Sequence, residues 1–288
     1  MVLDETYELA NGVSIPKLGL GTWFIDDGDA AEAVRNAVAL GYRGIDTAQA
    51  YGNERGVGEG VRTCGLVREQ LFVTSKVAAE HKSYAEAARS IDDTLALMQL
   101  DYLDLMIVHS PQPWAQWRGQ ERYFSENRDV WRALEDAYDA GKLRAIGVSN
   151  FLVDDVENLL EGCRIQPLVN QILVHVGNTP SALIAFCHAH GLRVMSYSPI
   201  AHGRALASAQ IGDMARGYGV TPAQLCIRYV LQLGTVALPK SGSAVHMAEN
   251  AAVDFEIAPE DMQTLSRIEF ADYGEFDVFP VFSGKQQA

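Results

Sequence analysis

Four side chains with acid–base chemistry lie at or just after segments expected to be buried strands. Asp46 follows the run GI, Lys76 ends FVTSK, His109 ends LMIVH, and Tyr51 lies in the segment AQAYGNE between the first two. Each residue alone has an ordinary structural interpretation. Because the carboxyl ends of parallel strands meet at one rim, however, the four are expected to converge there, which unrelated structural residues would not do.

The group has the composition of a proton donor directed at a carbonyl. A tyrosine hydroxyl has an ordinary pKa of about 10, and the nearby ammonium of Lys76 is expected to lower the pKa of Tyr51. A buried ammonium needs a counter-ion, which Asp46 can supply, and the imidazole of His109 can orient a carbonyl oxygen. The predicted catalytic residues are therefore Asp46, Tyr51, Lys76 and His109. No metal is predicted, since the chain has neither an HxxxH pair nor a Cys/His cluster.

Eight apolar runs of strand type alternate with helical segments, which predicts a parallel sheet. The runs span residues 18–22, 44–48, 71–76, 103–109, 145–149, 167–172, 193–198 and 235–239. Their near-regular spacing favours a (β/α)8 barrel, formed by residues 1–288 as one α/β domain, over a two-domain protein. The two longest steps predict enlarged loops at the C-terminal mouth, at about 110–126 and 199–221.

Local signals predict where several elements begin and end. Residues 6–16 are typical of a hairpin that turns at Asn11-Gly12 and plugs the bottom of the barrel. Predicted N-caps are Asp29, Ser83, Thr179 and Thr221, and predicted C-terminal caps are Gly41, Gly141 and Gly191. The aromatic tail after Phe270 is expected to be a loop that packs near the mouth.

Composition argues against several classes of partner. Of the 288 residues 48% are apolar and 21% charged, which supports a large core. The net charge of −14 disfavours nucleic acid and anionic membranes. No apolar run reaches the roughly 18 residues of a membrane span, the N-terminus lacks a signal-peptide pattern, and the four cysteines form no CxxC pair. We therefore expect a cytoplasmic protein that binds a small molecule and neither nucleic acid nor membrane.

Five segments resemble signatures of the aldo-keto reductase family. They are GLGTW, GYRGIDTAQAYGNERGVG, RAIGVSNF, YSPI and LPKSGSAVHMAEN. The resemblance extends over essentially the whole chain, and PAQLCIRYVLQ places it near the bacterial branch similar to 2,5-diketo-D-gluconate reductase. Two positions depart from the family pattern: Gly44, where His, Ser, Ala or Leu is more usual, and His246, where Arg is usual.

The resemblance implies a carbonyl reductase in which a hydride passes from a nicotinamide cofactor to an aldehyde or ketone and Tyr51 delivers the proton. The residues implied at the nicotinamide and pyrophosphate are Ser149, Asn150, Gln171, Tyr197, Ser198 and Ile200. Those implied at the adenosine end are Lys240, Ser241, His246, Glu249 and Asn250. On the substrate side the resemblance implies Trp23, Tyr51 and His109, and we add Trp114 from the enlarged loop after residue 109.

Alternatives remain open for the cofactor, for single residues and for the function. His246 lacks the permanent charge and planar fork of arginine, so NADH is possible, although Lys240 and Ser241 favour NADPH. Ser149 and Asn150 are also compatible with helix capping, Gln171 with a core amide and Tyr197 with barrel packing. Four of the other histidines are predicted to be structural or on the surface, namely His175, His188, His190 and His202.

Two rival functions use the same barrel. One is a nicotinamide-binding regulatory subunit with little turnover, against which the complete set of four catalytic residues argues. The other is a metal-dependent hydrolase, for which the sequence lacks a ligand cluster. The family is often monomeric, so we expect a monomer that acts on a small-molecule carbonyl substrate.

Overall fold

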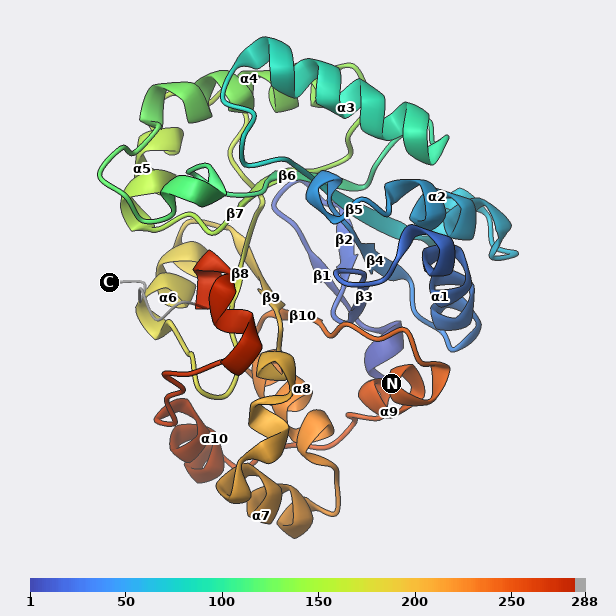
Figure 1. Cartoon of the computed structure of the whole chain (residues 1–288), viewed down its shortest axis with the longest axis vertical. Helices are drawn as coiled ribbons and strands as arrows, with labels where there is room; N and C mark the ends of the chain where they lie inside the picture. The colour runs from blue at the N-terminus through green and yellow to red at the C-terminus, as the bar shows by residue number, and fades with distance from the viewer. Residues whose placement is uncertain (283–288) are drawn as a thin grey trace.

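A ring of eight parallel strands forms the centre of the protein in the computed structural model, which describes residues 1–282 (Figure 1). The strands are β3 (Gly19–Gly21), β4 (Gly44–Asp46), β5 (Phe72–Val77), β6 (Leu105–Val108), β7 (Ile146–Ser149), β8 (Val169–Leu173), β9 (Arg193–Tyr197) and β10 (Val236–Leu238). Neighbours pair in chain order, and bridges from Leu18 to Ala237 and from Gly21 to Lys240 join the first strand to the last. The predicted (β/α)8 barrel is confirmed, since all eight apolar runs overlap observed strands.

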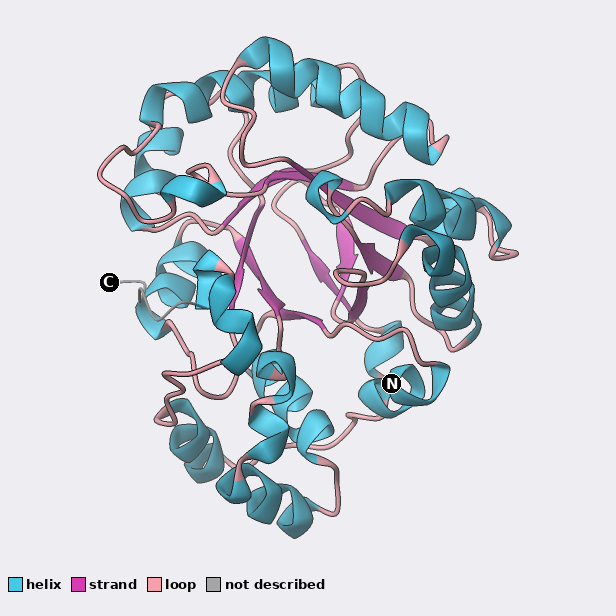
Figure 2. Ribbon diagram, viewed as in Figure 1, coloured by secondary structure: helices cyan, strands magenta, loops and turns pink. Residues whose placement is uncertain are grey.

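The helices surround the strands (Figure 2). They are α1 (Asp27–Ala39), α2 (Glu54–Thr63), α3 (Tyr84–Met98), α4 (Phe124–Asp139), α5 (Val153–Leu160), α6 (Ser181–Ala189), α7 (Ala209–Tyr218), α8 (Pro222–Gln232), α9 (Ala244–Ala251) and α10 (Pro259–Ser266). Strands β5 to β8 are buried at every position. Helices therefore cover their outer face while side chains fill the inner one, which explains the continuous apolar runs in the sequence.

The N-terminal hairpin is present as predicted. Strands β1 (Thr6–Glu8) and β2 (Ser14–Pro16) pair antiparallel, and Gly12 in the connecting turn has a φ of 84°, which glycine adopts without strain. Leu9 and Ile15 pack in one cluster with inward-facing barrel residues such as Phe72, Leu105 and Met195. The hairpin thus closes the bottom of the barrel.

Some element boundaries differ from the predictions. Helix α1 begins at Asp27 rather than after Asp29, because one of several adjacent acidic residues, Asp26, takes the cap position. Thr179 does not cap α6, since its hydroxyl lies 2.8 Å from that of Tyr229 on α8. The predicted caps Ser83 and Thr221 accept the expected backbone hydrogen bonds. Part of the loop predicted at 199–221 is helix α7, whose buried side chains are Ile211 and Ala215.

The C-terminal tail packs against the segment that follows β8 (Figure 1, red). The backbone N–H of Phe270 donates to the carbonyl of Gly177 at 2.9 Å, and the Tyr273 hydroxyl lies 3.1 Å from Nε2 of buried His175. A Cβ on Gly177 would lie 2.3 Å from Cδ2 of Phe270, so only glycine permits this approach. Arg204, in the loop after β9, holds the Asp272 carboxylate at 3.0 Å.

None of the helices within residues 1–282 has the length and apolar character required to cross a bilayer. The four cysteines are free thiols, of which Cys187 and Cys226 are buried and Cys64 and Cys163 half-buried. Burial raises the pKa of Cys226 to about 12, so this thiol is unreactive at neutral pH.

Candidate active site

A cavity of about 830 Å³ opens at the carboxyl ends of the strands. Its wall includes three of the four predicted catalytic side chains, Asp46, Tyr51 and His109, while the fourth, Lys76, is completely buried. Ligand pockets commonly measure roughly 300–1,000 Å³. The cavity therefore has room for a small organic molecule together with part of a larger one.

The short segment that carries Tyr51 is held by the buried amide of Asn53. Its Nδ2 donates to the carbonyls of Thr22 and Ile25, both at 2.9 Å, and its Oδ1 accepts from the Thr47 hydroxyl at 2.7 Å. Helix α2 follows directly and packs against α1 so closely that a Cβ on Gly56 would lie 2.1 Å from a backbone oxygen. These contacts hold Tyr51 beside the end of β4.

Lys76 and Asp46 form a buried ion pair behind the cavity. The ammonium Nζ donates to Asp46 Oδ2 at 2.6 Å and to the Thr47 carbonyl at 2.7 Å. It also lies 4.8 Å from the centroid of the Tyr51 ring, and the centroid of the His109 ring lies 5.7 Å from that of Tyr51. The structure thus brings together the four side chains that are separated along the chain.

Burial dominates the electrostatics of these groups. It raises the pKa of Tyr51 well above its ordinary value, with a further contribution from the Asp46 carboxylate. The expected lowering of the Tyr51 pKa is therefore not observed, because burial outweighs the nearby ammonium of Lys76, whose charge is balanced by Asp46 at 2.6 Å. Burial lowers the pKa of Lys76, with Asp46 opposing the shift. Burial and then Lys76 lower the pKa of His109, so Tyr51 and His109 are both neutral at neutral pH.

A second wall of the cavity is built from amides and hydroxyls at the ends of β7, β8 and β9. Asn150, in a left-handed conformation with φ 63°, donates through Nδ2 to the His109 carbonyl and to Ser149 Oγ, both at 3.0 Å. Its Oδ1 accepts from the Tyr197 hydroxyl at 2.8 Å. Gln171 Nε2 donates to Asp46 Oδ1 at 2.7 Å, which joins this wall to the ion pair.

The helix-capping alternative for Ser149 and Asn150 is not observed. Helix α5 begins at Val153 after Leu152, whose N–H donates to the Asp155 carboxylate at 2.9 Å. Ser149 Oγ instead donates to the Gln171 carbonyl at 2.8 Å. The polar side chains of this wall therefore bond mainly to one another and to neighbouring strand ends.

The predicted cofactor residues divide into two sets. Seven line the cavity, namely Ser149, Asn150, Gln171, Tyr197, Ser198, Ile200 and Lys240. Four lie outside its wall on the segment that leads into α9, namely Ser241, His246, Glu249 and Asn250. Lys240 and His246 are exposed, and Lys240 makes no ion pair within residues 1–282.

The predicted substrate residues Trp23 and Trp114 also line the cavity. Trp114 packs edge-on against His109 at 5.1 Å between ring centroids, and Trp23 packs edge-on against Phe279 of the tail at 5.0 Å. His202, predicted to be structural or on the surface, lies in the same wall. Its Nε2 is 3.0 Å from Ser198 Oγ, a contact that depends on the local fold and left no signal in the sequence.

The donor set of the cavity fits a nicotinamide dinucleotide. Among the lining residues, the Tyr197 ring and the amides of Asn150 and Gln171 suit a flat carboxamide-bearing ring, and the hydroxyl of Ser198 and the ammonium of Lys240 suit an anionic group. A group of three or more His, Cys, Asp or Glu side chains able to hold a metal ion is absent from the described part of the chain, residues 1–282.

The chain matches a known family and several characterised proteins. The model of the Aldo/keto reductase family matches residues 17–269. Glyoxal reductase of Bacillus subtilis is 40% identical over 92% of this chain and 93% of the relative. Methylglyoxal reductase DkgA of Escherichia coli is 34% identical over 93% of this chain and 95% of the relative.

Solved structures agree in fold. An aldo/keto reductase from Brucella melitensis superposes with a TM-score of 0.84 at 31% identity, covering 91% of this chain and 98% of the other. An aldo-keto reductase from Bombyx mori in complex with NADP superposes with a TM-score of 0.82 at 27% identity, covering 96% and 98%. The neighbours therefore have the same barrel over nearly their whole length.

Proposed function

The chain belongs to the aldo/keto reductase family and is an oxidoreductase that acts on aldehydes or ketones, and from that premise we propose that Tyr51 is its general acid. The observation that carries this proposal is the convergence of Tyr51, His109 and the Lys76–Asp46 pair at one cavity. Members of the family use NADP(H), and the reduced dinucleotide, when bound, supplies a hydride to the carbonyl carbon. The remaining chemistry falls to side chains of this protein.

The geometry supports a separate role for each group. The neutral imidazole of His109 orients the carbonyl oxygen by a hydrogen bond toward Tyr51. Because the pKa of Tyr51 is raised, the phenol remains protonated at neutral pH and gives its proton only to a strong base such as the developing alkoxide. The Lys76 ammonium beside the ring then stabilises the phenolate that is left. Asp46 holds Lys76 in place and balances its charge when Tyr51 is neutral.

We propose NADPH as the preferred cofactor, with NADH as a weaker one. Ser149, Asn150, Gln171 and Tyr197 would hold the nicotinamide, and Ser198 and Ile200 the pyrophosphate. At the adenosine end, Lys240 and Ser241 would contact the 2′-phosphate, and Glu249 and Asn250 the adenine. His246 offers no permanent charge for a 2′-phosphate, which leaves Lys240 and Ser241 as the basis of the preference.

Glyoxal and methylglyoxal are the substrates to test first, because relatives are named for them. The assay follows oxidation of NADPH or NADH by absorbance, with each dicarbonyl and with a larger aromatic aldehyde. Sustained, enzyme-dependent oxidation supports a reductase. Tight NADPH binding without turnover of any carbonyl would instead favour the regulatory binding module and would refute the proposed activity.

A further inference from the structure

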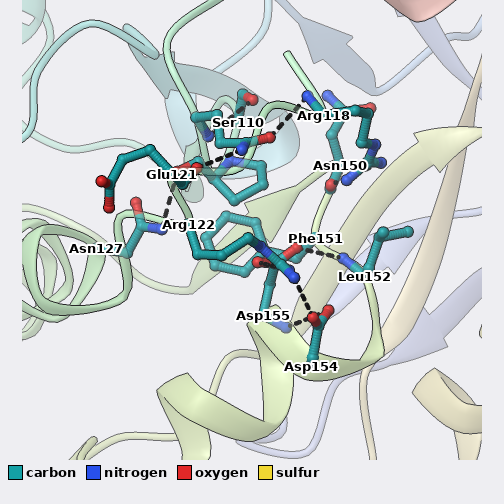
Figure 3. A network of polar contacts seen from close by, with 12 residues as sticks. Ser110, Arg118, Glu121, Arg122, Asn127, Asn150, Phe151, Leu152, Asp154 and Asp155 are labelled. Carbon is teal, nitrogen blue, oxygen red and sulfur yellow. Dashed lines mark hydrogen bonds and ion pairs between the residues drawn. The ribbon is translucent and has the colours of Figure 1, made fainter. Parts of the chain in front are cut away.

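The enlarged loop that follows β6, residues 110–123, is fastened to the barrel at both ends. At its start, the Asn127 amide donates to the Pro111 carbonyl at 2.9 Å and Lys82 Nζ donates to the Ser110 carbonyl at 3.0 Å. At its end, Arg122 forms ion pairs with Asp154 and Asp155 at the N-terminus of α5 (Figure 3). The loop also contributes Trp114 to the wall of the cavity.

Between these anchors, Gln112 folds the loop onto itself. Its Nε2 donates to the carbonyls of Gly119 and Glu121 at 3.1 and 2.5 Å, and its Oε1 accepts from the backbone N–H of Arg118 at 2.8 Å. This arrangement presents Arg118 toward the barrel with a φ of 54°. Its guanidinium lies over the Trp117 ring, 4.3 Å from the centroid.

Arg118 differs from its neighbour Arg122 in what it binds. Within residues 1–282 it forms no ion pair, although it is half-buried and its Nε is buried without a hydrogen-bond partner. Its Nη2 instead donates to the backbone carbonyl of Asn150 at 3.3 Å (Figure 3). An arginine that only anchors a loop is expected to pair with a carboxylate, because a carboxylate is a better hydrogen-bond acceptor for guanidinium than a single carbonyl. The half-buried guanidinium of Arg118 is instead directed at one backbone carbonyl.

The carbonyl that Arg118 binds belongs to Asn150, which contacts both His109 and Tyr197. Asn150 is in a left-handed conformation, which is strained for a non-glycine residue. Its side chain bonds to the backbone of His109 on one side and to the hydroxyl of Tyr197 on the other. If the peptide after Asn150 turned, both bonds would be lost together.

We propose that Arg118 is a positioning residue that holds Asn150, and through it Tyr197 and His109, in the arrangement that binds the dinucleotide and the carbonyl. The inference rests on the proposed function, since it assigns Arg118 a part in the same site. It also makes the loop 110–123 a determinant of cofactor affinity, although Arg118 does not line the cavity. Loss of Arg118 lowers the fraction of molecules with Asn150 in place, and the apparent dissociation constant rises in inverse proportion to that fraction.

The test measures NADPH binding to the full-length protein by fluorescence titration, together with thermal unfolding and KM for methylglyoxal. Arg118→Ala is expected to weaken NADPH binding about tenfold and to raise KM. The matched control is Arg122→Ala, which loosens the same loop but leaves Asn150 untouched, and it should stay within about twofold of wild type. Arg118→Lys, which retains a charged donor, should recover part of the affinity.

A double variant tests whether the effect passes through Asn150. In Tyr197→Phe the hydroxyl that bonds to Asn150 is absent, so adding Arg118→Ala should weaken binding by less than it does in wild type. Equal NADPH affinity of Arg118→Ala and wild type, equal losses in Arg118→Ala and Arg122→Ala, or the same loss in both backgrounds would each overturn the inference. A wild-type protein that binds NADPH but reduces no carbonyl overturns the proposed function alone, and one that does not bind NADPH overturns both.

Discussion

Replacing Tyr51 with phenylalanine removes one oxygen from the site and little else. The ring contacts that fix Tyr51 are made by its face and edges, to the Lys76 ammonium at 4.8 Å, the His109 ring at 5.7 Å and the Trp23 ring at 6.3 Å. Phenylalanine can keep all three, so the shape of the cavity is preserved. The Lys76–Asp46 pair does not involve the hydroxyl and should also persist.

A positioned general acid contributes roughly 10²–10⁴-fold to a rate. In the proposed mechanism Tyr51 is the group that gives the proton, because burial keeps His109 neutral and Lys76 is held by Asp46. We therefore expect kcat for methylglyoxal to fall about 10³-fold in Tyr51→Phe, which corresponds to about 4 kcal/mol of transition-state stabilisation. NADPH affinity should remain within about twofold of wild type, since an uncharged hydroxyl off the nicotinamide wall contributes little to it.

The assay is stopped-flow and steady-state oxidation of NADPH, with binding measured separately by fluorescence. Because the pKa of Tyr51 is raised, wild-type turnover should show no loss from Tyr51 ionisation below about pH 10, the ordinary value for a phenol. A variant that retained more than about a tenth of wild-type kcat would refute the role of Tyr51 as acid, because general acid catalysis accounts for at least about 10²-fold. A large loss of NADPH affinity would show that the substitution disturbs the cavity instead.

Three further predictions concern other ionisable side chains. Lys76→Met leaves the buried Asp46 carboxylate without its ion-pair partner and should lower the free energy of unfolding by about 3–5 kcal/mol, whereas Lys76→Met combined with Asp46→Asn should recover stability in urea titrations but not turnover. Burial lowers the pKa of His175 to about 4, so between about pH 6.5 and 4 the unfolded chain binds more protons than the folded protein does. The free energy of unfolding should therefore fall by up to about 3 kcal/mol as the pH drops through that window. His175→Gln should flatten this pH dependence, whereas His190→Gln, at an exposed position, should leave it unchanged. His246→Arg should tighten NADPH binding about fivefold and leave NADH unchanged, and an equal gain for both cofactors would place residue 246 away from the 2′-phosphate.

The barrel was predictable because its signals are local and repeated. Each buried parallel strand needs apolar residues on both faces, so every strand appears as a continuous run that ends in a turn or cap. The errors arise where a contact distant in sequence decides the outcome. Thr179 has the residue type of an N-cap, but Tyr229 on α8 takes its hydroxyl. Helix α7 lies within the segment predicted as a mouth loop, and only two of its side chains, Ile211 and Ala215, are buried.

The positions of the site residues were more predictable than their electrostatics. Strand ends identify Asp46, Lys76 and His109 because parallel strands bring their carboxyl ends to one rim. The sign of the Tyr51 pKa shift is not accessible in this way, since it depends on how completely Asp46 neutralises Lys76 and on how deeply the phenol is packed among its neighbours. Both are properties of the packed site rather than of residue types.

Arg118 shows most clearly why part of the site has no signature in the sequence. An arginine in a long polar loop has the appearance of a solvated surface charge, and Arg122, four residues later, is an ordinary partner for two aspartates. What separates them is the internal fold of the loop around Gln112, which directs Arg118 alone to the Asn150 carbonyl. If that contact positions Asn150, loops of this barrel can adjust cofactor affinity from outside the cavity, and sequence changes there can alter binding without touching a single residue that contacts the ligand.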